Sequence, residues 1–457
     1  MPVAIWWIRR DVRLTDNFAL QAARKTGYPV VPVFIRDSRL MANSVNRRQR
    51  FLVNALKDLQ AQLRQEGSDL LVRSGEPSDV LSTLVREMSA VGVYAEKDFS
   101  PFAKNRDEKV SREVPLTLTG GLTIHPPDAV LKPDGAPYTI FTPYSRKWLS
   151  LPAPFLPTSA PGDFLPSNQF PGLELLPAMD PVEGFAATRE EAESRLALFL
   201  SLKIDEYANQ RDRMDLNGTS GLSPYIRFGL LSPARLSLVI RQQAGYLMDG
   251  QRTWLNELIW RDFYQSILHH FPFVKYEAFQ PKFRHIPWRN APDDLRAWKD
   301  GLTGYPVVDA AMRQLKSTGW MHNRARMITA SFLTKDLLIN WQDGERWFMD
   351  QLVDGDTASN NGGWQWAAGT GTDAAPYFRI FNPVLQGKRF DPHGVYIRHW
   401  VPELRNLPDQ YIHEPWAVPP LEQVSFGLVI GRDYPHPIVE HNLVRERTLA
   451  AYRASAG

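Results

Sequence analysis

The loop at residues 354–366 carries a dense set of polar and aromatic side chains. It reads DGDTASNNGGWQW, with Asp354 and Asp356 two positions apart. A calcium loop of the EF-hand type is excluded, because position six is Ser359 instead of Gly and position twelve is Gln365 instead of Glu. Aspartates accept from N–H and O–H groups, and indoles stack on flat rings. We expect a polar, flat heterocycle here and no metal ion. The alternative is a polar turn beside core tryptophans.

A small hydroxyl-rich loop at residues 218–224, GTSGLSP, predicts the start of a helix. Free N–H groups and the helix dipole at such a start attract a phosphate. A capped helix start with no ligand is the alternative, and the loop taken alone favours it.

Residues 254–264, WLNELIWRDFY, form a helical pattern in which Trp254, Glu257, Arg261 and Tyr264 fall along one stripe. A glutamate between indoles loses hydration, which is costly unless the side chain is paired or functional. An intrahelical Glu257–Arg261 ion pair on a half-buried helix is the alternative.

Residues 320–327, WMHNRARM, are the fourth segment with chemical potential. Arg324 and Arg326 cannot both face a core, so at least one meets solvent or an anion. Asn323 offers both a donor and an acceptor to the edge of a base or of a flavin. Hydrolytic motifs are missing: there is no G-x-S-x-G, no H-E-x-x-H and no G-x-x-x-x-G-K-[ST].

Composition narrows the class of protein. Cysteine is absent, which excludes disulfides, thiolate metal sites and cysteine nucleophiles. The net charge of +3 neither predicts nor excludes a local basic groove for nucleic acid. No apolar run approaches the roughly 18 residues of a membrane span, and the start reads as a strand instead of a signal peptide. We expect a soluble, cytoplasmic protein. Eleven of the 14 tryptophans stand at or after Trp254, which fits a large core, a flat ligand or electron transfer.

The first 125 residues alternate between apolar runs and helical patterns, which predicts a doubly wound α/β domain with a parallel sheet. The expected strands are Val3–Ile8, Val30–Ile35, Asp69–Arg73, Val91–Glu96 and Gly121–His125, and the clearest helices are Arg47–Glu66 and Pro77–Met88. Arg9, Arg10 and Asp11 stand where a dinucleotide motif would place glycines, so a standard dinucleotide site is not expected in this domain.

Residues 126–185 hold 13 of the 36 prolines and little periodicity, which predicts a linker or strap, packed at least in part through Phe141–Trp148. From about residue 186 the chain reads as helical. Ser-Pro pairs at Ser223 and Ser232 predict hydroxyl-capped helix starts. Further helices are expected at Thr253–His270, Tyr305–Lys316, Asn323–Asn340 and Glu345–Leu352. The predicted domains are 1–127 (α/β), 128–190 (linker) and 191–457 (all-α).

Taken in order, these segments resemble the photolyase/cryptochrome family. The run from Asp354, which continues as TGTDAAPYFRIFNP from Thr370, and the run 320–327 carry the resemblance. It extends from WWIRRDVRLTDN near the start to HEPW and YPHPIVEH near the end. The chain is most similar to the class I cyclobutane pyrimidine dimer photolyases of microbes. The resemblance implies an α/β antenna domain, a strap and a helical FAD domain. It also implies light-driven repair by electron transfer from excited, reduced FAD to a flipped-out dimer in UV-damaged DNA.

The resemblance also assigns roles to single residues. Those expected to contact FAD are Tyr207, Thr219, Ser220, Gly221, Leu222, Ser223, Trp254, Arg261, Arg326, Asp354, Gly355, Asp356 and Asn360. Those expected to pass electrons from the surface to photo-oxidised flavin are Trp298, Trp341 and Trp364. Those expected to act on the dimer, together with Asn360 beside the flavin's central ring nitrogen, are Glu257, Trp260, Asn323, Met327 and Trp366. Those expected to bind the surrounding DNA are Arg211, Tyr264, Arg324 and Gln386.

Three rival functions stay open at this level. A cryptochrome would share the fold and flavin, but signalling members often carry a long extension after the FNP segment, and Asn323, Met327 and Trp366 match the repair pattern. A (6-4) photolyase usually has a histidine in the stretch of Asn323 to Met327, and His322 lies one position away. A non-catalytic binding module would leave the ordered tryptophans unexplained.

A second, light-harvesting chromophore is also implied. Folate-binding members carry an Asn-Glu pair near residues 100–104, where this chain has SPFAK. Residues 98–107 are more similar to members that bind 8-hydroxy-5-deazaflavin or a flavin. Arg10 and Asp98 are the expected contacts, at the strand-end crevice of the α/β domain. An empty antenna site is the alternative. The resemblance further suggests a monomer.

Overall fold

The computed structural model describes residues 1–40, 46–157, 162–242 and 247–456. The chain divides into two compact units, each described by itself below: Met1–Asp205 with Ser220–Pro272 form unit 1, and Glu206–Thr219 with Phe273–Gly457 form unit 2. The domain boundaries expected from the sequence stay a prediction. Residues 158–161 of the predicted strap lie outside the described residues.

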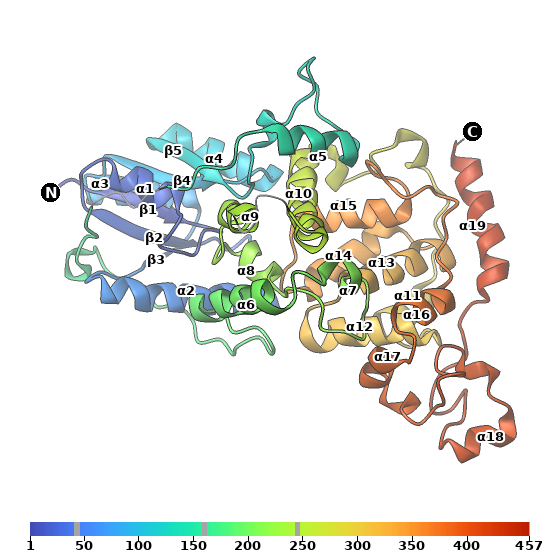
Figure 1. Cartoon of the computed structure of the whole chain (residues 1–457). Helices are drawn as coiled ribbons and strands as arrows, with labels where there is room; N and C mark the ends of the chain where they lie inside the picture. The colour runs from blue at the N-terminus through green and yellow to red at the C-terminus, as the bar shows by residue number, and fades with distance from the viewer. Residues whose placement is uncertain (41–45, 158–161, 243–246, 457) are drawn as a thin grey trace. The chain divides into compact units, whose positions relative to one another are not determined.

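Unit 1 is built on a five-stranded parallel sheet with the strand order β3-β2-β1-β4-β5 (Figure 1). The strands are β1 (Ala4–Ile8), β2 (Val30–Arg36), β3 (Leu71–Ser74), β4 (Gly92–Lys97) and β5 (Leu116–Gly121). Ala4 is in register with both Val30 and Gly92, so β1 is the central strand. All five residues of β1 are buried, as a strand covered on both faces requires. The predicted doubly wound sheet is confirmed.

The predicted fifth strand, Gly121–His125, is wrong in position. The strand ends at Gly121, and the buried residues after it belong to a loop. The backbone amides of Ile124 and His125 donate to the carboxylate of Asp262 instead of to a neighbouring strand, at 2.9 and 3.2 Å. Apolar character there reflects burial under a helix, whereas the true edge strand is half exposed.

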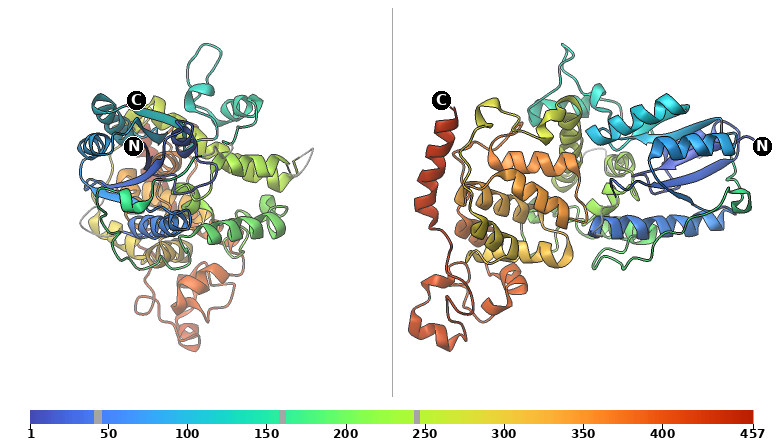
Figure 2. Two further views of the ribbon diagram at one scale, coloured as in Figure 1. Left: turned by 90° about the vertical axis from the view of Figure 1, so that its left-hand side faces the viewer. Right: turned by 180° about the vertical axis from the view of Figure 1, so that it is seen from behind.

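The helices of unit 1 are α1 (Phe18–Arg24), α2 (Arg47–Gln65), α3 (Pro77–Glu87), α4 (Pro101–Glu113), α5 (Phe141–Ser150), α6 (Arg189–Leu202), α8 (Ser223–Arg227), α9 (Pro233–Gln242) and α10 (Asp249–His270). A capping box between Asn46 and Gln49 starts α2. Leu81 of α3 and Val110 of α4 share one apolar cluster with Ile5 of β1. Helix α2 runs along the opposite side of the sheet (Figures 1 and 2). The predicted helices α2 and α3 are confirmed.

The proline-rich stretch contains a helix that its low periodicity did not predict. Helix α5 packs on α10 through Phe141, Tyr144 and Trp148, and the indole of Trp148 donates to Asp262 at 3.0 Å. Two single turns flank it, η1 (Pro127–Ala129) and η2 (Ser167–Gln169). The stretch is therefore a packed strap, as the FTPYSRKW segment indicated.

The two Ser-Pro pairs behave differently. Ser232 accepts from the backbone N–H of Arg235 at 3.4 Å and so caps α9 as predicted. Ser223 is itself the first residue of the five-residue helix α8, and no side chain caps that helix. The predicted cap at Ser223 is wrong, because the helix begins one residue earlier than the Ser-Pro pattern places it.

Unit 2 is helical. Its helices are α7 (Tyr207–Gln210), α11 (Pro292–Asp300), α12 (Pro306–Thr318), α13 (Asn323–Ser331), α14 (Trp341–Gln351), α15 (Thr357–Ala368), α16 (Pro383–Phe390), α17 (Val395–Trp400), α18 (Pro420–Ser425) and α19 (His441–Ala456). Short turns of helix are η3 (Pro272–Lys275), η4 (Pro281–Phe283), η6 (Pro402–Leu404) and η7 (Pro415–Ala417). A core of buried tryptophan, leucine and alanine side chains runs between α12, α13, α14 and α15. The all-α half is thus confirmed.

The predicted helix Asn323–Asn340 is correct only in its first half. Helix α13 ends at Ser331, a π-helical turn η5 covers Phe332–Asp336, and Leu338 has a positive φ of 53°. The wide turn directs two charged side chains inward. Lys335 donates to the backbone oxygen of Ala368 at 2.7 Å, and Asp336 pairs with His441. These buried polar contacts interrupt the regular helix.

Among the described residues, no helix combines the length and apolar character that crossing a membrane would require.

Candidate active site

The loop that leads into α15 contributes a buried carboxylate, Asp354, to an ion pair with the half-buried Arg326. Arg326 on α13 donates from Nη2 to Oδ2 of Asp354 at 2.8 Å, and its Nε donates to the backbone oxygen of Met321. The other carboxylate oxygen, Oδ1, is buried and has no hydrogen-bond partner among the described residues. Buried acceptors are normally satisfied, so this oxygen suits an N–H or O–H of a ligand.

The next residues of the loop fix the start of α15. Asp356 accepts from the amides of Ala358 and Ser359 at 3.1 Å each and is the N-cap. Asn360 donates from Nδ2 to the backbone oxygen of Glu345 on α14 at 3.0 Å. This bond orients the amide of Asn360 and leaves its oxygen as the atom that can accept from a ligand. Gly355, between the two aspartates, is buried.

A half-buried glutamate on α14, Glu345, contacts the two asparagines of α15. Oε1 of Glu345 accepts from Nδ2 of Asn361 at 3.1 Å. Burial raises the pKa of Glu345 to about 7, although the bond from Asn361 lowers it in part. No sequence pattern marks this group, because Glu345 lies in the middle of an ordinary amphipathic helix.

Three aromatic rings pack in the core beside this loop. Trp364 on α15 meets Phe348 edge-on at 4.9 Å between ring centroids and Trp298 at 6.0 Å. Gly344 on α14 allows this packing, because a Cβ there would lie 2.1 Å from the Trp364 ring. Trp341, also on α14, is 3% exposed, and all four side chains belong to one cluster. The predicted electron-transfer tryptophans therefore share one core.

Trp298 cannot be the surface end of that series, since its side chain has zero exposure. Trp288 is half-buried and packs against the same cluster. Arg289 donates to the backbone oxygens of Leu338 and Leu337, which places Trp288 beside the segment that enters Trp341. Sequence reasoning missed Trp288, because an isolated tryptophan in an irregular stretch has no pattern around it.

The predicted dimer residues Asn323 and Met327 lie on one side of α13, with Nδ2 of Asn323 3.8 Å from the sulfur of Met327. Arg324 stacks over Phe390 and pairs with Asp212 at 2.6 Å. Arg211 is the other neighbour of Asp212, at 3.9 Å. An acidic residue thus holds both predicted DNA-binding arginines in the described structure.

The remaining predicted residues of unit 2 are spread over three elements. Trp366 on α15 is half-buried, as is Gln386 on α16, whose Oε1 has no described hydrogen-bond partner. Tyr207 begins α7 and is buried, with the Arg211 guanidinium 5.8 Å from its ring.

His322 is a structural residue. Its Nδ1 accepts from the backbone N–H of Arg324 at 3.1 Å, so it caps α13. Burial lowers the pKa of His322 to about 4, which keeps the ring neutral. A proton-donating histidine of the kind the (6-4) alternative needs is not supplied by this side chain.

Helix α10 of unit 1 carries the tryptophan-flanked stripe. Trp260 stacks face to face on Phe141 of α5, with centroids 3.7 Å apart and planes 2° apart. The Tyr264 ring lies 5.5 Å from that of Trp260, with the two planes tilted by 32°. Trp254 is buried against Phe199. Stacked aromatic rings make a rigid, apolar face.

The polar members of the same stripe are half-buried. Arg261 donates to the backbone oxygen of Leu122 and lies 3.8 Å from Asp262. Glu257, the glutamate of the stripe, is half-buried, and its role at the dimer stays a prediction.

The loop at residues 218–223 crosses the boundary between the units, after Thr219. In unit 2, a Cβ on Gly218 would lie 2.6 Å from the Gln210 side chain, so glycine is required there. In unit 1, Gly221 has a positive φ of 63°, Leu222 is buried, and Ser220 Oγ lies 3.5 Å from the amide of Leu222. Helix α8 is so short that its dipole adds little to a phosphate site.

The predicted antenna residues meet at the carboxyl ends of β1 and β4. Arg10 lies 3.3 Å from Asp98, and Arg106 stacks over the Trp7 ring at 4.8 Å. Burial would raise the pKa of Asp98, but the charge of Arg10 and the Ser100 amide lower it to about 2. Strand order reverses between β1 and β4, which is where α/β sheets bind ligands.

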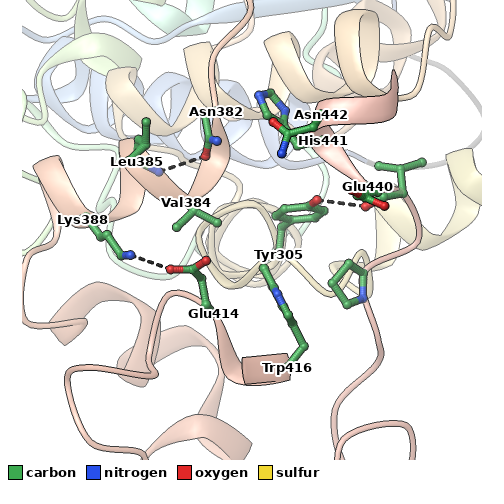
Figure 3. Close-up of a pocket in the computed structure, with 12 residues that line it drawn as sticks. Tyr305, Asn382, Val384, Leu385, Lys388, Glu414, Trp416, Glu440, His441 and Asn442 are labelled. Atoms are coloured by element: carbon green, nitrogen blue, oxygen red, sulfur yellow. Dashed lines mark hydrogen bonds and ion pairs between the residues drawn. The ribbon is translucent and has the colours of Figure 1, made fainter. Parts of the chain in front are cut away.

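A separate pocket of about 580 Å³ lies in unit 2 (Figure 3). Its walls include Tyr305, Trp416 and the ion pair of Lys388 with Glu414 at 2.5 Å. The predicted site residues are not among the described residues that line it. Size alone does not make it the functional site.

Comparison with known proteins identifies the family. Residues 4–161 match the family model described as DNA photolyase, and residues 254–454 match the FAD binding domain of DNA photolyase. The deoxyribodipyrimidine photo-lyase of Escherichia coli strain K12 is 42% identical, over 100% of this chain and 99% of its own.

Two solved photolyase structures are also similar to this chain over nearly its whole length. A bacterial class III photolyase from Agrobacterium tumefaciens is 36% identical with a TM-score of 0.93, over 100% of this chain and 98% of its own. An archaeal photolyase from Sulfolobus tokodaii is 30% identical with a TM-score of 0.84, over 99% of both chains.

A parallel α/β unit and a helical unit with these motifs define a light-dependent flavoprotein. The chain belongs to the DNA photolyase family. It is an enzyme of light-driven DNA repair that uses FAD.

Proposed function

We propose that the chain splits cyclobutane pyrimidine dimers in DNA by light-driven electron transfer from bound FAD. The observation that carries the proposal is the orphaned Oδ1 of Asp354, held beside Arg326 in a buried position where a ligand donor would satisfy it. The relatives named deoxyribodipyrimidine photo-lyase support the substrate.

The FAD contacts divide by chemistry. Asp354 would accept from the flavin ring, and the hydrogen bond from Arg326 orients its carboxylate. Asn360 presents its amide oxygen to the central ring nitrogen. The remaining proposed contacts are Tyr207, Thr219, Ser220, Gly221, Leu222 and Ser223 around the pyrophosphate, with Trp254, Arg261, Gly355 and Asp356 around the ring and ribose.

Reduced FAD, when bound, supplies the electron that splits the dimer after it absorbs light. This chain's tryptophans would deliver electrons that restore the reduced state. Trp364, Trp341 and Trp298 form the buried part of the route, and Trp288 forms its outer end. The 6.0 Å between the rings of Trp298 and Trp364, and the packing of all four tryptophans in or against one cluster, support this assignment.

The dimer must leave the duplex, because its reacting bonds are out of reach in the stack. Trp260 and Trp366 offer indole faces to the two pyrimidines, and Asn323 and Met327 line the pocket. Glu257 stabilises the extra charge on the pyrimidine carbonyls if it shares its proton. Arg211, Arg324, Tyr264 and Gln386 bind the flanking DNA, which requires the arginines to exchange Asp212 for phosphate.

We further propose a flavin-type antenna at Arg10 and Asp98, or an 8-hydroxy-5-deazaflavin, in preference to a folate. The Sulfolobus tokodaii photolyase carries two FAD molecules, which supports a flavin as one option. Extraction of the chromophores followed by mass spectrometry would identify the antenna. We also propose that the enzyme is a monomer, which light scattering on the purified protein would test.

Repair under blue light tests the main proposal. Reduced protein is mixed with a thymine-dimer oligonucleotide and illuminated, and recovery of pyrimidine absorbance is followed against a dark control. We expect recovery only in the light, and less of it with Asp354→Asn. Absence of recovery with reduced FAD bound would refute dimer splitting, and the same assay on a (6-4) lesion would then reveal the alternative.

A further inference from the structure

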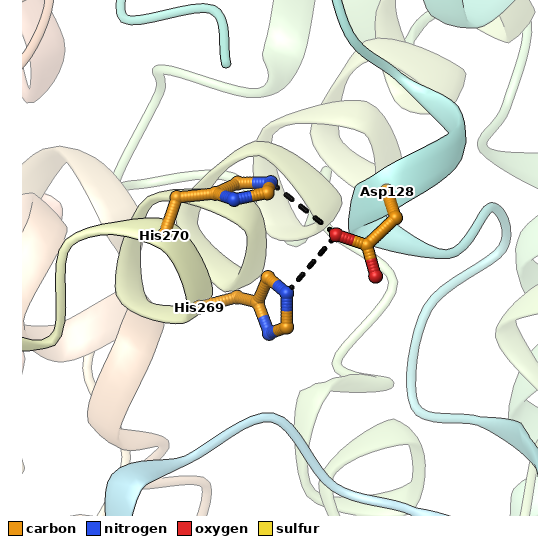
Figure 4. A group of neighbouring side chains, drawn as sticks. All are labelled: Asp128, His269 and His270. Carbon is orange, nitrogen blue, oxygen red and sulfur yellow. Dashed lines mark hydrogen bonds and ion pairs between the residues drawn. The ribbon is translucent and has the colours of Figure 1, made fainter. Parts of the chain in front are cut away.

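Two histidines at the end of α10 and an aspartate in η1 direct their polar atoms at one point in unit 1 (Figure 4). Nε2 of His269 lies 3.2 Å from Oδ1 of Asp128, and Nε2 of His270 lies 4.0 Å from the same oxygen. The three atoms all lie within 4.8 Å of one another. None of the three residues belongs to the flavin or DNA contacts proposed above.

Hydrogen bonding does not account for this arrangement. A separation of 4.0 Å is too long for a hydrogen bond, so Asp128 can satisfy only one of the two rings. Nε2 of His270 is buried and has no hydrogen-bond partner in the described part of the chain. A buried polar atom of this kind indicates a partner that side chains do not provide.

We propose that Asp128, His269 and His270 bind a divalent transition metal ion of the zinc class, with water completing the coordination. Two imidazole nitrogens and one carboxylate oxygen are a ligand set that zinc accepts. Ligand atoms at about 2.1 Å from a tetrahedral ion lie roughly 3.4 Å apart. The observed separations of 3.2 and 4.0 Å are near that value. Asp128 is 59% exposed and has room to turn the remaining distance.

One positive charge lies close to the cluster. Lys104 donates to the backbone oxygen of His269 at 3.0 Å. Its positive charge opposes a cation, which makes the carboxylate of Asp128 essential to the site.

The site would be structural. It would tie η1 to the last turn of α10, two turns beyond Asp262, which already holds the amides of Ile124 and His125. Helix α10 carries the stacked Trp260, so the ion would stabilise the element that presents this ring. No sequence pattern predicted this site, because Asp128 lies far from the two histidines along the chain.

Zinc retention tests the proposal. Untagged, FAD-loaded protein is stripped with EDTA, dialysed against Zn²⁺, and analysed for metal per chain by mass spectrometry. His270→Gln and Asp128→Asn each remove a ligand. The matched control is His393→Gln, which removes an exposed histidine that pairs with Asp409 at 3.0 Å but belongs to no such cluster of three possible ligands among the described residues.

We expect one zinc ion per chain in the parent and in His393→Gln, and at least tenfold weaker binding in the two ligand variants. Zn²⁺ should also raise the melting temperature of the parent but not of His270→Gln. Equal retention in all variants, or none in the parent, would overturn the proposal. FAD absorbance and circular dichroism show whether each variant has folded. If a variant has not folded, zinc retention by the parent protein tests the proposal.

Discussion

Asn361 donates to the carboxylate of Glu345 across a distance of 3.1 Å, and this bond joins α15 to α14. The neighbouring Asn360 is bonded to the backbone oxygen of the same glutamate. Both asparagines of the predicted flavin loop are therefore positioned by one residue that has no role in the sequence-based assignment.

The first prediction concerns Glu345 and pH. Burial raises its pKa from 4.5 to about 7, so the folded state favours the protonated acid. The stability it contributes is fully present below pH 4.5 and is lost as the pH rises through about 7. The loss at pH 8 is on the order of 3 kcal/mol. Glu345→Gln should abolish this loss, so its melting temperature should exceed that of the parent at pH 8 but not at pH 5.

Asp350→Asn is the control for that comparison. Asp350 is an exposed carboxylate on the same helix, so its variant should follow the parent at both pH values. Parallel melting curves for the parent and Glu345→Gln across this range would contradict the assignment.

The second prediction concerns the ion pair of Asp354 with Arg326. Asp354→Asn removes a charge-assisted hydrogen bond, which costs about 1.5–3 kcal/mol. The ratio of FAD to protein, measured by absorbance after gel filtration, should fall at least several-fold. Asp343→Asn breaks the exposed pair with Arg346 on α14 instead, where the cost is about 0–1 kcal/mol, and should leave FAD retention unchanged. Equal losses in both variants would point to a general effect on unit 2.

The accuracy of each prediction from the sequence depended on whether the contacts involved are local or distant along the chain. Four strands and the helices α2, α3, α10 and α12 followed from periodicity, because a repeating apolar face is a local property. The prediction of the fifth strand was wrong, because residues 122–125 are buried through a contact with Asp262. This aspartate lies 138 residues from Ile124 along the chain. The prediction of a regular helix through Phe332–Asp336 was wrong for the same reason. The buried charged side chains of this π-helical turn have their partners on distant elements.

The residues of the site also divide into those that a local pattern predicts and those that it does not. The residue types of the loop at 354–366 indicated a ligand site, and the family resemblance named Arg326 together with Asp354 and Asp356 among the flavin contacts. The sequence could not identify Glu345, whose pKa is raised by burial. It could not show that Trp288 is partly exposed whereas Trp298 is fully buried. It also could not find the cluster of Asp128 with His269 and His270. Burial and long-range proximity are properties of the packed chain and leave no local pattern.

The third prediction concerns the outer end of the tryptophan series. Trp298 has zero exposure, so an electron that enters from solvent must first reach a more accessible ring. Trp288→Phe should slow light-driven reduction of oxidised FAD at least tenfold, and Trp364→Phe should abolish it. The measurement is the flavin absorbance under blue light with an external reductant.

Trp347→Phe provides the comparison for Trp288. Trp347 is half-buried and packs against the same cluster, but Lys299 lies over its ring at 5.0 Å. Its variant should be reduced at the parent rate. If Trp298→Phe alone is slow while Trp288→Phe is normal, the route leaves the core elsewhere.

The fourth prediction concerns the stacked pair of Phe141 and Trp260. One face of Trp260 is covered by Phe141 at 3.7 Å, so only the other face is left for a pyrimidine. Phe141→Ala removes a stacking contact of about 0.5–1.5 kcal/mol and lets the indole turn. We expect affinity for a thymine-dimer oligonucleotide, measured by fluorescence anisotropy, to fall roughly 2- to 10-fold, with FAD content unchanged. Phe155→Ala, at a 68% exposed position of the same strap, should bind as the parent does. If both variants bind equally well, the strap does not position Trp260, and the indole must be held by α10 alone.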